Sequence, residues 1–142
     1  NNRRLIAVGS GFKTKKSRSK ESTRLLLYGL NQFDTIKISS KDNSFDELDV
    51  WLGNKNKVKV YTKNNIFKTI PKARKKYLEA KIIYNGPIMA PIKKDQILGK
   101  LIISYKDELL SEHDLLALEK VKQVNIFTRL IRSINYLIWG DV

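Results

Sequence analysis

The chain has 142 residues, 28 Lys and Arg against 14 Asp and Glu, a formal net charge of +14 and no cysteine. The lack of cysteine excludes a disulfide framework, a Cys-ligated zinc and a thiol nucleophile, and 42% hydrophobic residues exclude a disordered chain. No apolar run reaches the roughly 18 residues that a transmembrane helix needs. The length allows one ordinary domain, or a small domain with appendages.

The positive charge is spread along the chain, with +7 over residues 1–38, +5 over residues 39–120 and +2 over residues 121–142. A strongly basic chain suggests nucleic acid or anionic lipid as a partner. Lysine outnumbers arginine 21 to 7, and Asn and Ile are also abundant, which fits an AT-rich coding sequence. The even distribution of positive charge is therefore better explained by codon bias and an anionic partner surface than by a nucleic-acid-binding groove.

The first segment is predicted to be a strand followed by a helix. Leu5–Val8 is a short apolar run closed by Gly9-Ser-Gly11, and Ser17 or Ser19 can cap the helix that follows. The apolar positions of that helix are Leu25, Leu26, Gly29, Leu30 and Phe33. Since one strand and one helix cannot enclose a core, this segment is expected to be the edge of a larger α/β domain or an ordered appendage.

The middle of the chain is predicted to consist of short strands separated by Asn-, Gly-, Asp- and Pro-containing turns. The expected strands are 35–38, 47–52, 57–61, 80–84, 99–105 and 114–121. Lys57 and Lys59 alternate with Val58 and Val60, as expected for a strand with one face in water. This spacing predicts a small antiparallel β-sandwich.

Two features of the middle segment are expected to be structural. Trp51, between Val50 and Leu52, is interpreted as a core or half-buried aromatic residue. The densest basic patch is interpreted as a solvated turn or a guard of an edge strand, because no aromatic residues interleave with it as they do in single-strand binding sites. Its members are Lys72, Arg74, Lys75 and Lys76.

The C-terminal stretch, residues 122–142, is predicted to form an amphipathic helix. At 100° per residue, its apolar residues fall within an arc of about 140° on one face of the helix. The helix is too short to span a bilayer but long enough to lie on its surface. The predicted membrane-binding residues are Ile126, Phe127, Arg129, Leu130, Ile131, Arg132, Ile134, Leu137, Ile138 and Trp139. Periodicity alone leaves open that this helix packs on the β domain or on a copy of itself.

No catalytic or metal-binding constellation stands out. Ser10-x-x-Lys13 and Ser17-x-x-Lys20 match a nucleophile-and-base spacing, but the abundance of Ser and Lys predicts such matches by chance. His113, the only histidine, is predicted to be a surface residue in an acidic turn. Asp46 and Glu47 are adjacent on a strand and point to opposite faces. No catalytic residue, metal or cofactor is expected in this chain.

The order of these features resembles the C-terminal third of the serine-type D-alanyl-D-alanine carboxypeptidases, the low-molecular-mass penicillin-binding proteins. The segments that carry the resemblance are 4–8, 21–29 and 33–37, then 48–53, 89–92 with 96–101, 115–121 and 125–140. The most specific part is Ala90-Pro-Ile92 and Gly99-Lys-Leu101, followed by a leucine-rich strand and the terminal helix. The resemblance covers nearly all of residues 3–140 in collinear order.

The resemblance implies three parts. Residues 1–35 would be the last strand and helix of the penicillin-recognising domain, residues 36–121 the C-terminal β domain, and residues 122–142 the membrane-surface helix. The family's Ser-x-x-Lys, Ser-x-Asn and Lys-Thr-Gly motifs would precede Asn1, so the chain is expected to be the inactive downstream part of a longer enzyme. Lys13-Thr14 is followed by Lys15 rather than Gly, and Lys94-Asp95 occupies a turn where the family usually has Gly.

The sequence thus predicts a mainly β chain that begins with a strand and helix and ends with an amphipathic helix. By resemblance it is a noncatalytic part of an enzyme that trims peptidoglycan stem peptides on the periplasmic face of the bacterial cytoplasmic membrane. Its expected partners are an anionic membrane surface, peptidoglycan and other cell-wall proteins, without specific nucleic acid. The alternative is a basic nucleic-acid-binding β module with a dimerising C-terminal helix.

Overall fold

The computed structural model describes residues 4–41, 43–106 and 108–125, together with Ile134 and Ile138. In chain order the described elements are α1 (Lys15–Gln32), β1 (Phe33–Ser39), β2 (Asp46–Trp51), β3 (Lys57–Thr62), β4 (Ile66–Pro71), the 3-10 helix η1 (Lys72–Tyr77), β5 (Leu78–Tyr84), β6 (Ile88–Met89), β7 (Ile97–Tyr105) and β8 (Glu108–Ala117). The predicted mainly β class, with a helix before the strands, is confirmed.

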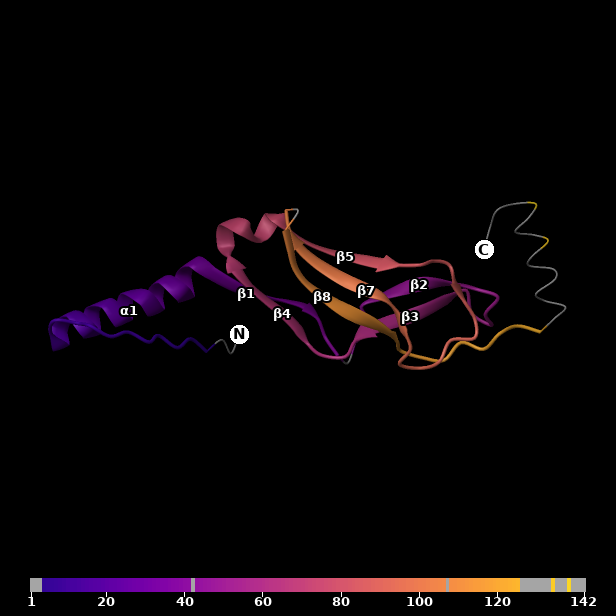
Figure 1. The fold of residues 1–142 in the computed structure, drawn as a ribbon, viewed down its shortest axis with the longest axis horizontal. Helices are drawn as coiled ribbons and strands as arrows, with labels where there is room; N and C mark the ends of the chain where they lie inside the picture. The colour runs from indigo at the N-terminus through magenta and orange to yellow at the C-terminus, as the bar shows by residue number, and fades with distance from the viewer. Residues whose placement is uncertain (1–3, 42, 107, 126–133, 135–137, 139–142) are drawn as a thin grey trace.

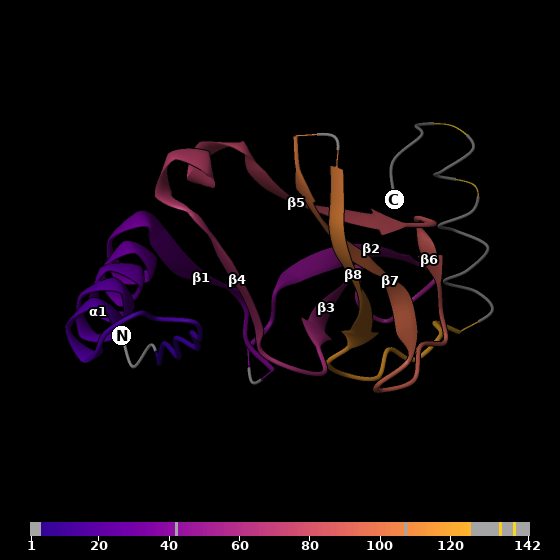
Figure 2. The same cartoon turned by 60° about the vertical axis from the view of Figure 1, so that its left-hand side comes forward.

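Two sheets make up the β region. Six strands form a curled sheet in the order β5-β7-β8-β3-β2-β6, antiparallel except for the β2–β6 pair, and β1 pairs with β4 in a separate antiparallel ribbon. The ribbon connects α1 to the curled sheet, so the molecule is elongated, with α1 at one end and residues 118–125 near the other (Figure 1). The sheet curls between its two halves, so that β5 and β7 lie on one side of the curl and β2 on the other (Figure 2).

The core lies inside the curled sheet and follows from the alternation of the strands. In β3 the lysines face water while Val58 and Val60 are fully buried, as the alternating sequence predicts. Leu101 and Ile103 of β7 are likewise fully buried. The other buried members of this core are Leu48, Val50, Ile66, Ala90, Ile92, Leu115, Ala117 and Val121. Burial of these apolar side chains supplies the main driving force for folding of the β domain.

Gly99 allows β5 and β7 to pair closely. A Cβ atom at this position would lie 2.7 Å from the carbonyl oxygen of Ile83 and 2.8 Å from the Cβ of Tyr84. The two strands are in register here, with Tyr84 opposite Gly99. A side chain would therefore push the edge strand β5 away from β7.

A buried hydroxyl pair joins the ribbon to the curled sheet. Ser39 at the end of β1 and Thr62 at the end of β3 are 4% and 1% exposed, and their hydroxyl oxygens lie 2.7 Å apart. The Thr62 hydroxyl also lies 3.0 Å from the carbonyl oxygen of Asn64, to which it donates. Because buried polar groups are costly without partners, this pair fixes the point where β1 meets β3.

The N-terminal segment differs from the prediction in two details. The helix cap is Thr14 rather than Ser17 or Ser19: the Ser17 backbone N–H donates to the Thr14 hydroxyl oxygen over 3.0 Å, and Ser17 completes a capping box. The strand predicted at Leu5–Val8 is wrong, because residues 4–12 carry no strand. An apolar run becomes a strand only beside another strand, and none of the described strands pairs with this one.

Most predicted strands are present, with shifted ends. The strand expected at 114–121 is β8, which begins earlier, at Glu108, and ends at Ala117, while Val121 makes only an isolated bridge to Ile92. Two strands were not predicted from the sequence: β4 and the two-residue strand β6. His113 lies within β8, so its assignment to a turn was wrong.

Candidate functional site

The formal Ser-x-x-Lys matches do not form a nucleophile-and-base pair. The Ser17 hydroxyl is committed to the helix cap, where it donates to the Thr14 carbonyl oxygen over 2.8 Å and accepts from the Thr14 N–H over 3.1 Å. Lys13 and Lys20 are exposed. A lysine acts as a general base only when it is desolvated, and these exposed side chains lack that environment.

Metal-ligating side chains do not gather within the described ranges, where no group of three or more His, Asp or Glu side chains could hold an ion. His113 is half-buried in β8, and its Nε2 lies 3.1 Å from the Ser111 hydroxyl oxygen. Burial lowers the pKa of His113 below its ordinary value of 6.5, and the positive charge of Lys68 lowers it further. A neutral histidine with a hydroxyl partner is a structural residue of the strand.

Two further residues singled out in the sequence lie in the β domain. Trp51, at the end of β2, is half-buried, as predicted. Asp95 lies in the turn where the resembled family usually has a Gly. Its backbone is left-handed, with φ of 64°. Its side chain accepts a hydrogen bond of 2.6 Å from the hydroxyl of Tyr61, so this Asp is held by a partner on β3.

The predicted membrane-binding residues fall almost entirely outside the described residues. Ile134 and Ile138 are described, as helical and exposed at 48% and 62%. The remaining eight are Ile126, Phe127, Arg129, Leu130, Ile131, Arg132, Leu137 and Trp139. Among the helices that the structure describes, none has the length and hydropathy to cross a bilayer.

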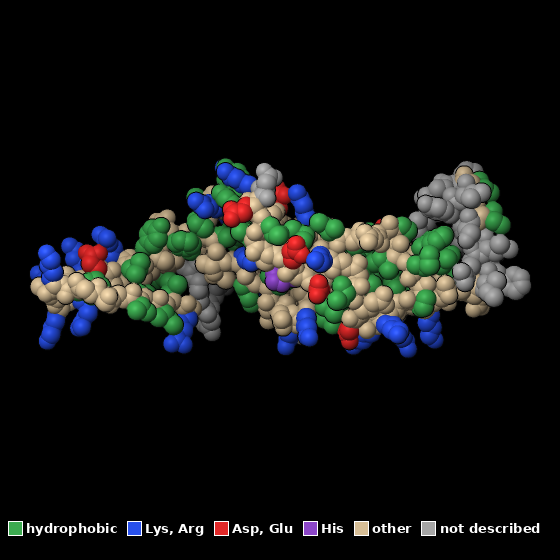
Figure 3. Space-filling view, in the orientation of Figure 1, with side chains coloured by type: hydrophobic (Ala, Val, Ile, Leu, Met, Phe, Trp, Pro, Cys, Tyr) green, Lys and Arg blue, Asp and Glu red, His purple; other side chains and the backbone are tan. Residues whose placement is uncertain are grey.

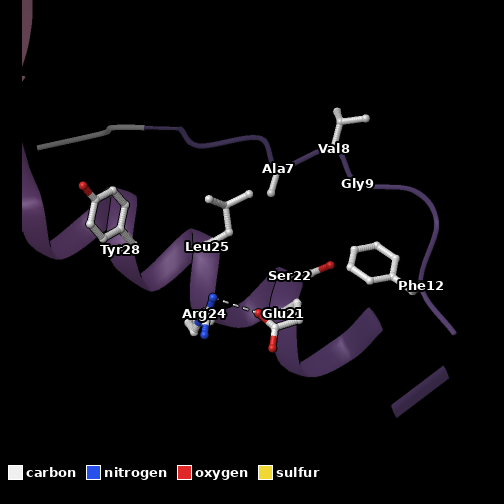
Figure 4. Close-up of a pocket in the computed structure, with 9 residues that line it drawn as sticks. All are labelled: Ala7, Val8, Gly9, Phe12, Glu21, Ser22, Arg24, Leu25 and Tyr28. Atoms are coloured by element: carbon white, nitrogen blue, oxygen red, sulfur yellow. Dashed lines mark ion pairs between the residues drawn. The ribbon is translucent and has the colours of Figure 1, made fainter. Parts of the chain in front are cut away.

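An apolar pocket of about 540 Å³ lies between the N-terminal segment and α1. The pocket is lined by Ala7, Val8, Gly9, Phe12, Glu21, Ser22, Arg24, Leu25 and Tyr28. Figure 4 shows Ala7 and Leu25 pointing toward each other across it, with Tyr28 and Phe12 on either side. An ion pair of 3.2 Å between Arg24 and Glu21 lies on its rim.

The helix beside this pocket leaves its apolar side chains uncovered. No residue of α1 is buried, and Leu25, Leu27 and Tyr28 are each more than half exposed. Val8 in the neighbouring segment is 89% exposed. Exposed apolar side chains gathered in this way are a feature typical of protein interaction surfaces.

The structure also gathers a cluster that sequence reasoning missed. The basic residues of η1 lie beside two tyrosines, Tyr77 and Tyr105, whose rings meet edge to face at 6.1 Å. The guanidinium of Arg74 lies 5.4 Å from the centre of the Tyr105 ring, and the ammonium of Lys76 lies 4.9 Å from that of Tyr77. This aromatic contact was not indicated by the sequence, because the prediction concerned only aromatic residues that interleave with the basic run as stacking platforms.

The tip of the β7–β8 hairpin completes this cluster. The ammonium of Lys106 lies 5.3 Å from the Tyr77 ring centre and 5.8 Å from that of Tyr105. The Lys106 backbone N–H donates to the Tyr77 carbonyl oxygen over 3.1 Å, which ties the hairpin tip to η1. We call these residues the η1 cluster: Lys72, Arg74, Lys75, Lys76, Tyr77, Tyr105 and Lys106.

Only part of the η1 cluster is contiguous in the sequence. Tyr77 directly follows the basic run, but Tyr105 and Lys106 lie almost thirty residues further along the chain. The β5–β7 register, with Leu78 opposite Tyr105, brings the two parts together.

Comparison with known proteins places the β region in a family. The family described as "Penicillin-binding protein 5, C-terminal domain" matches residues 33–123, from the start of β1 to just beyond β8. The D-alanyl-D-alanine carboxypeptidase DacD of Salmonella typhimurium is 31% identical over 129 residues, which is 90% of this chain and 33% of that protein. The DacA enzyme of Haemophilus influenzae is 32% identical over 131 residues, 92% of this chain and 33% of its own length.

Solved structures agree with the sequence match. Penicillin-binding protein 5 from Haemophilus influenzae aligns with a TM-score of 0.63 and 29% identity over 78% of this chain and 32% of that one. The carboxypeptidase DacD from Francisella tularensis aligns with a TM-score of 0.53 and 28% identity over 80% of this chain and 29% of that one. The chain spans about a third of the length of these relatives. The chain therefore belongs to the penicillin-binding protein 5 C-terminal domain family.

Proposed function

We propose that this chain is the C-terminal β domain and membrane attachment of a D-alanyl-D-alanine carboxypeptidase that trims peptidoglycan stem peptides. The observation that carries the proposal is the family match over residues 33–123, which includes every strand of the described fold. The catalytic serine and lysines belong, under this proposal, to a part of the enzyme that this chain does not contain. The enzyme would work on the periplasmic face of the cytoplasmic membrane.

The uncovered surface of α1 supports the link to a catalytic domain. The match to the carboxypeptidases extends over 90% of this chain, well beyond residues 33–123, so it includes α1. Leu25, Leu27 and Tyr28 are exposed on this helix. Under the proposal, the catalytic domain covers these side chains. This contact would hold the β domain rigidly against the enzyme's catalytic part.

The membrane attachment is assigned to residues 126–139 by their amphipathic pattern. Apolar side chains on one face would insert between lipid headgroups, with Arg129 and Arg132 near phosphates at about 1 kcal/mol each on an anionic surface. Exposure of Ile134 and Ile138 is compatible with this role. Attachment at this end would place the β domain between the bilayer and the catalytic domain.

A fluorescent penicillin tests the noncatalytic assignment. We expect no covalent label on the purified chain and no release of D-Ala from a peptide that ends in D-Ala-D-Ala, because a desolvated Ser-Lys pair is needed to form an acyl-enzyme. A carboxypeptidase of the same family serves as the positive control in both assays. Stoichiometric labelling of this chain would show that it contains an active site and would overturn the proposal.

Truncation tests the attachment, and the structure decides where to cut. Val121 is buried, and the Val124 N–H donates to the Leu52 carbonyl oxygen over 3.0 Å, so removal of residues 122–125 would damage the β domain. A chain that ends at Asn125 keeps these contacts. We expect the full chain to float with vesicles that contain phosphatidylglycerol, and the chain that ends at Asn125 to stay in the dense fraction. Equal flotation of the two would contradict the attachment.

A further inference from the structure

The η1 cluster gathers five cationic side chains at one place on the domain. Within the described part of the chain, none of its cations takes part in an ion pair. Of the nearby carboxylates, Glu79 is paired with Lys81 at 2.7 Å and Glu108 lies opposite Tyr105 at the hairpin tip. Figure 3 shows Lys and Arg side chains over the η1 region, with Asp and Glu side chains beside them. Like charges gathered in this way favour binding of an anion.

The two tyrosines hold the cations in place. A cation over an aromatic ring at an exposed site gains about 0.5–1 kcal/mol. Arg74, Lys76 and Lys106 each make such a contact, and Lys106 makes it with both rings. The positive charges are thereby partly ordered before any ligand arrives, which lowers the entropy lost on binding.

The ring faces distinguish this cluster from a single-strand nucleic-acid site. Stacking of bases requires free aromatic faces. Here cations lie 4.9–5.8 Å from the centres of both rings, and Tyr105 is half-buried. The cluster therefore presents charge rather than stacking platforms, and fits a polyanion that binds through its acidic groups.

The position of the cluster favours a polymer over the membrane. Figure 1 shows η1 and the β7–β8 tip at the end of the curled sheet that adjoins the β1–β4 ribbon, while residues 118–125 lie at the opposite end. If residues 126–139 attach to the bilayer, the η1 cluster lies on the side of the domain nearer to the catalytic part. On that arrangement, a polymer bound to the η1 cluster would lie on the side of the domain away from the bilayer.

We infer that the η1 cluster binds the peptidoglycan strand itself, through the carboxylates of its stem peptides, and retains the polymer beside the catalytic domain. The identity of the polymer rests on the proposed function. The cations Lys72, Arg74, Lys75, Lys76 and Lys106 attract the carboxylates, and Tyr77 and Tyr105 position the cations. No chemistry takes place at this surface: it raises the local concentration of the substrate polymer.

Pelleting with insoluble sacculi tests this inference. The test variant is Lys72→Gln/Arg74→Gln/Lys75→Gln/Lys76→Gln, and the matched control is Lys57→Gln/Lys59→Gln/Lys93→Gln/Lys94→Gln. All eight residues are exposed, and each variant lowers the net charge by the same amount. Urea unfolding checks that both variants stay folded.

We expect the full chain to pellet with sacculi at low salt, and the test variant to bind at least about tenfold more weakly. The control variant should bind sacculi within about threefold of the unchanged chain, since water and salt screen the attraction of scattered surface charges. With sacculi whose carboxylates have been amidated, the two quadruple variants should bind equally. Tyr77→Phe should bind like the unchanged chain, whereas Tyr77→Leu should bind more weakly because it lacks a ring for the cations.

Three results would overturn the inference: no pelleting of the unchanged chain, equal weakening of the two quadruple variants, or stronger cluster-dependent binding to RNA or to phosphatidylglycerol vesicles than to sacculi. The vesicle comparison is needed because Leu109 and Leu110 are exposed near the hairpin tip and could favour lipid. Failure here is separable from failure of the proposed function, because penicillin labelling and the truncation at Asn125 do not involve the η1 cluster.

Discussion

The hydroxyl of Tyr61 donates a 2.6 Å hydrogen bond to a carboxylate oxygen of Asp95, a residue whose backbone is left-handed with φ of 64°. The Asp95 N–H also donates to the Ala117 carbonyl oxygen over 2.8 Å, which fixes the turn against the end of β8. Asp95 thus links β3 and β8 to the turn that precedes β7. The stability of this junction is therefore sensitive to pH and to the residue at position 95.

The Tyr61–Asp95 contact predicts a loss of stability at high pH. The hydrogen bond to Asp95 raises the pKa of Tyr61 above its ordinary value of 10.0, so the folded state favours the neutral phenol. This contribution is complete below the unfolded pKa and falls as pH rises through the higher folded pKa. We expect urea unfolding above pH 10 to show a steeper fall in stability for the unchanged chain than for Tyr61→Phe. Parallel curves would contradict this prediction.

The backbone of Asp95 predicts different costs for two small replacements. Asp95→Ala loses the hydrogen bond and keeps a Cβ in the left-handed region, which costs roughly 1–2 kcal/mol relative to glycine. Asp95→Gly loses only the hydrogen bond. We expect Asp95→Ala to be the less stable by about 1 kcal/mol in urea unfolding. Equal stability would show that the left-handed backbone is not retained.

The buried Ser39–Thr62 pair predicts a non-additive result. Thr62→Val leaves the Ser39 hydroxyl buried without its 2.7 Å partner, and should cost about 1–3 kcal/mol. Adding Ser39→Ala removes the orphaned group, so the double variant should be more stable than Thr62→Val alone. A double-mutant cycle by urea unfolding measures the coupling, and a coupling of zero would mean that the two hydroxyls do not depend on each other.

Alternating strands were the part of the fold that could be predicted from sequence. Lys57–Tyr61 alternates in burial as expected, because one face of β3 lies on the core and the other in water. β4 was missed because it ends at Pro71 and is followed at once by a basic run, both of which are typical of a turn. Its pairing with β1 depends on a strand more than twenty residues earlier in the chain.

Tertiary context explains the remaining differences. Leu5–Val8 has the composition of a strand, but strand formation requires a hydrogen-bonding neighbour that the described fold does not offer. The η1 cluster needs the β5–β7 register as well as a basic run, so a local pattern could not reveal it. The capping box at Thr14 and Ser17 was accessible in principle, since the two residues have the spacing of the N-cap and the third helical position.

Flotation with substituted chains tests the central claim, attachment of this domain to a membrane by its C-terminal apolar face. Ile131→Asp/Ile134→Asp changes the predicted apolar face, and Thr128→Asp/Asn135→Asp makes the same charge change on the predicted polar face. We expect the first variant to remain in the dense fraction and the second to float with phosphatidylglycerol vesicles as the unchanged chain does. If both variants float equally well, or both fail equally, the apolar face is not the attachment and the account is contradicted.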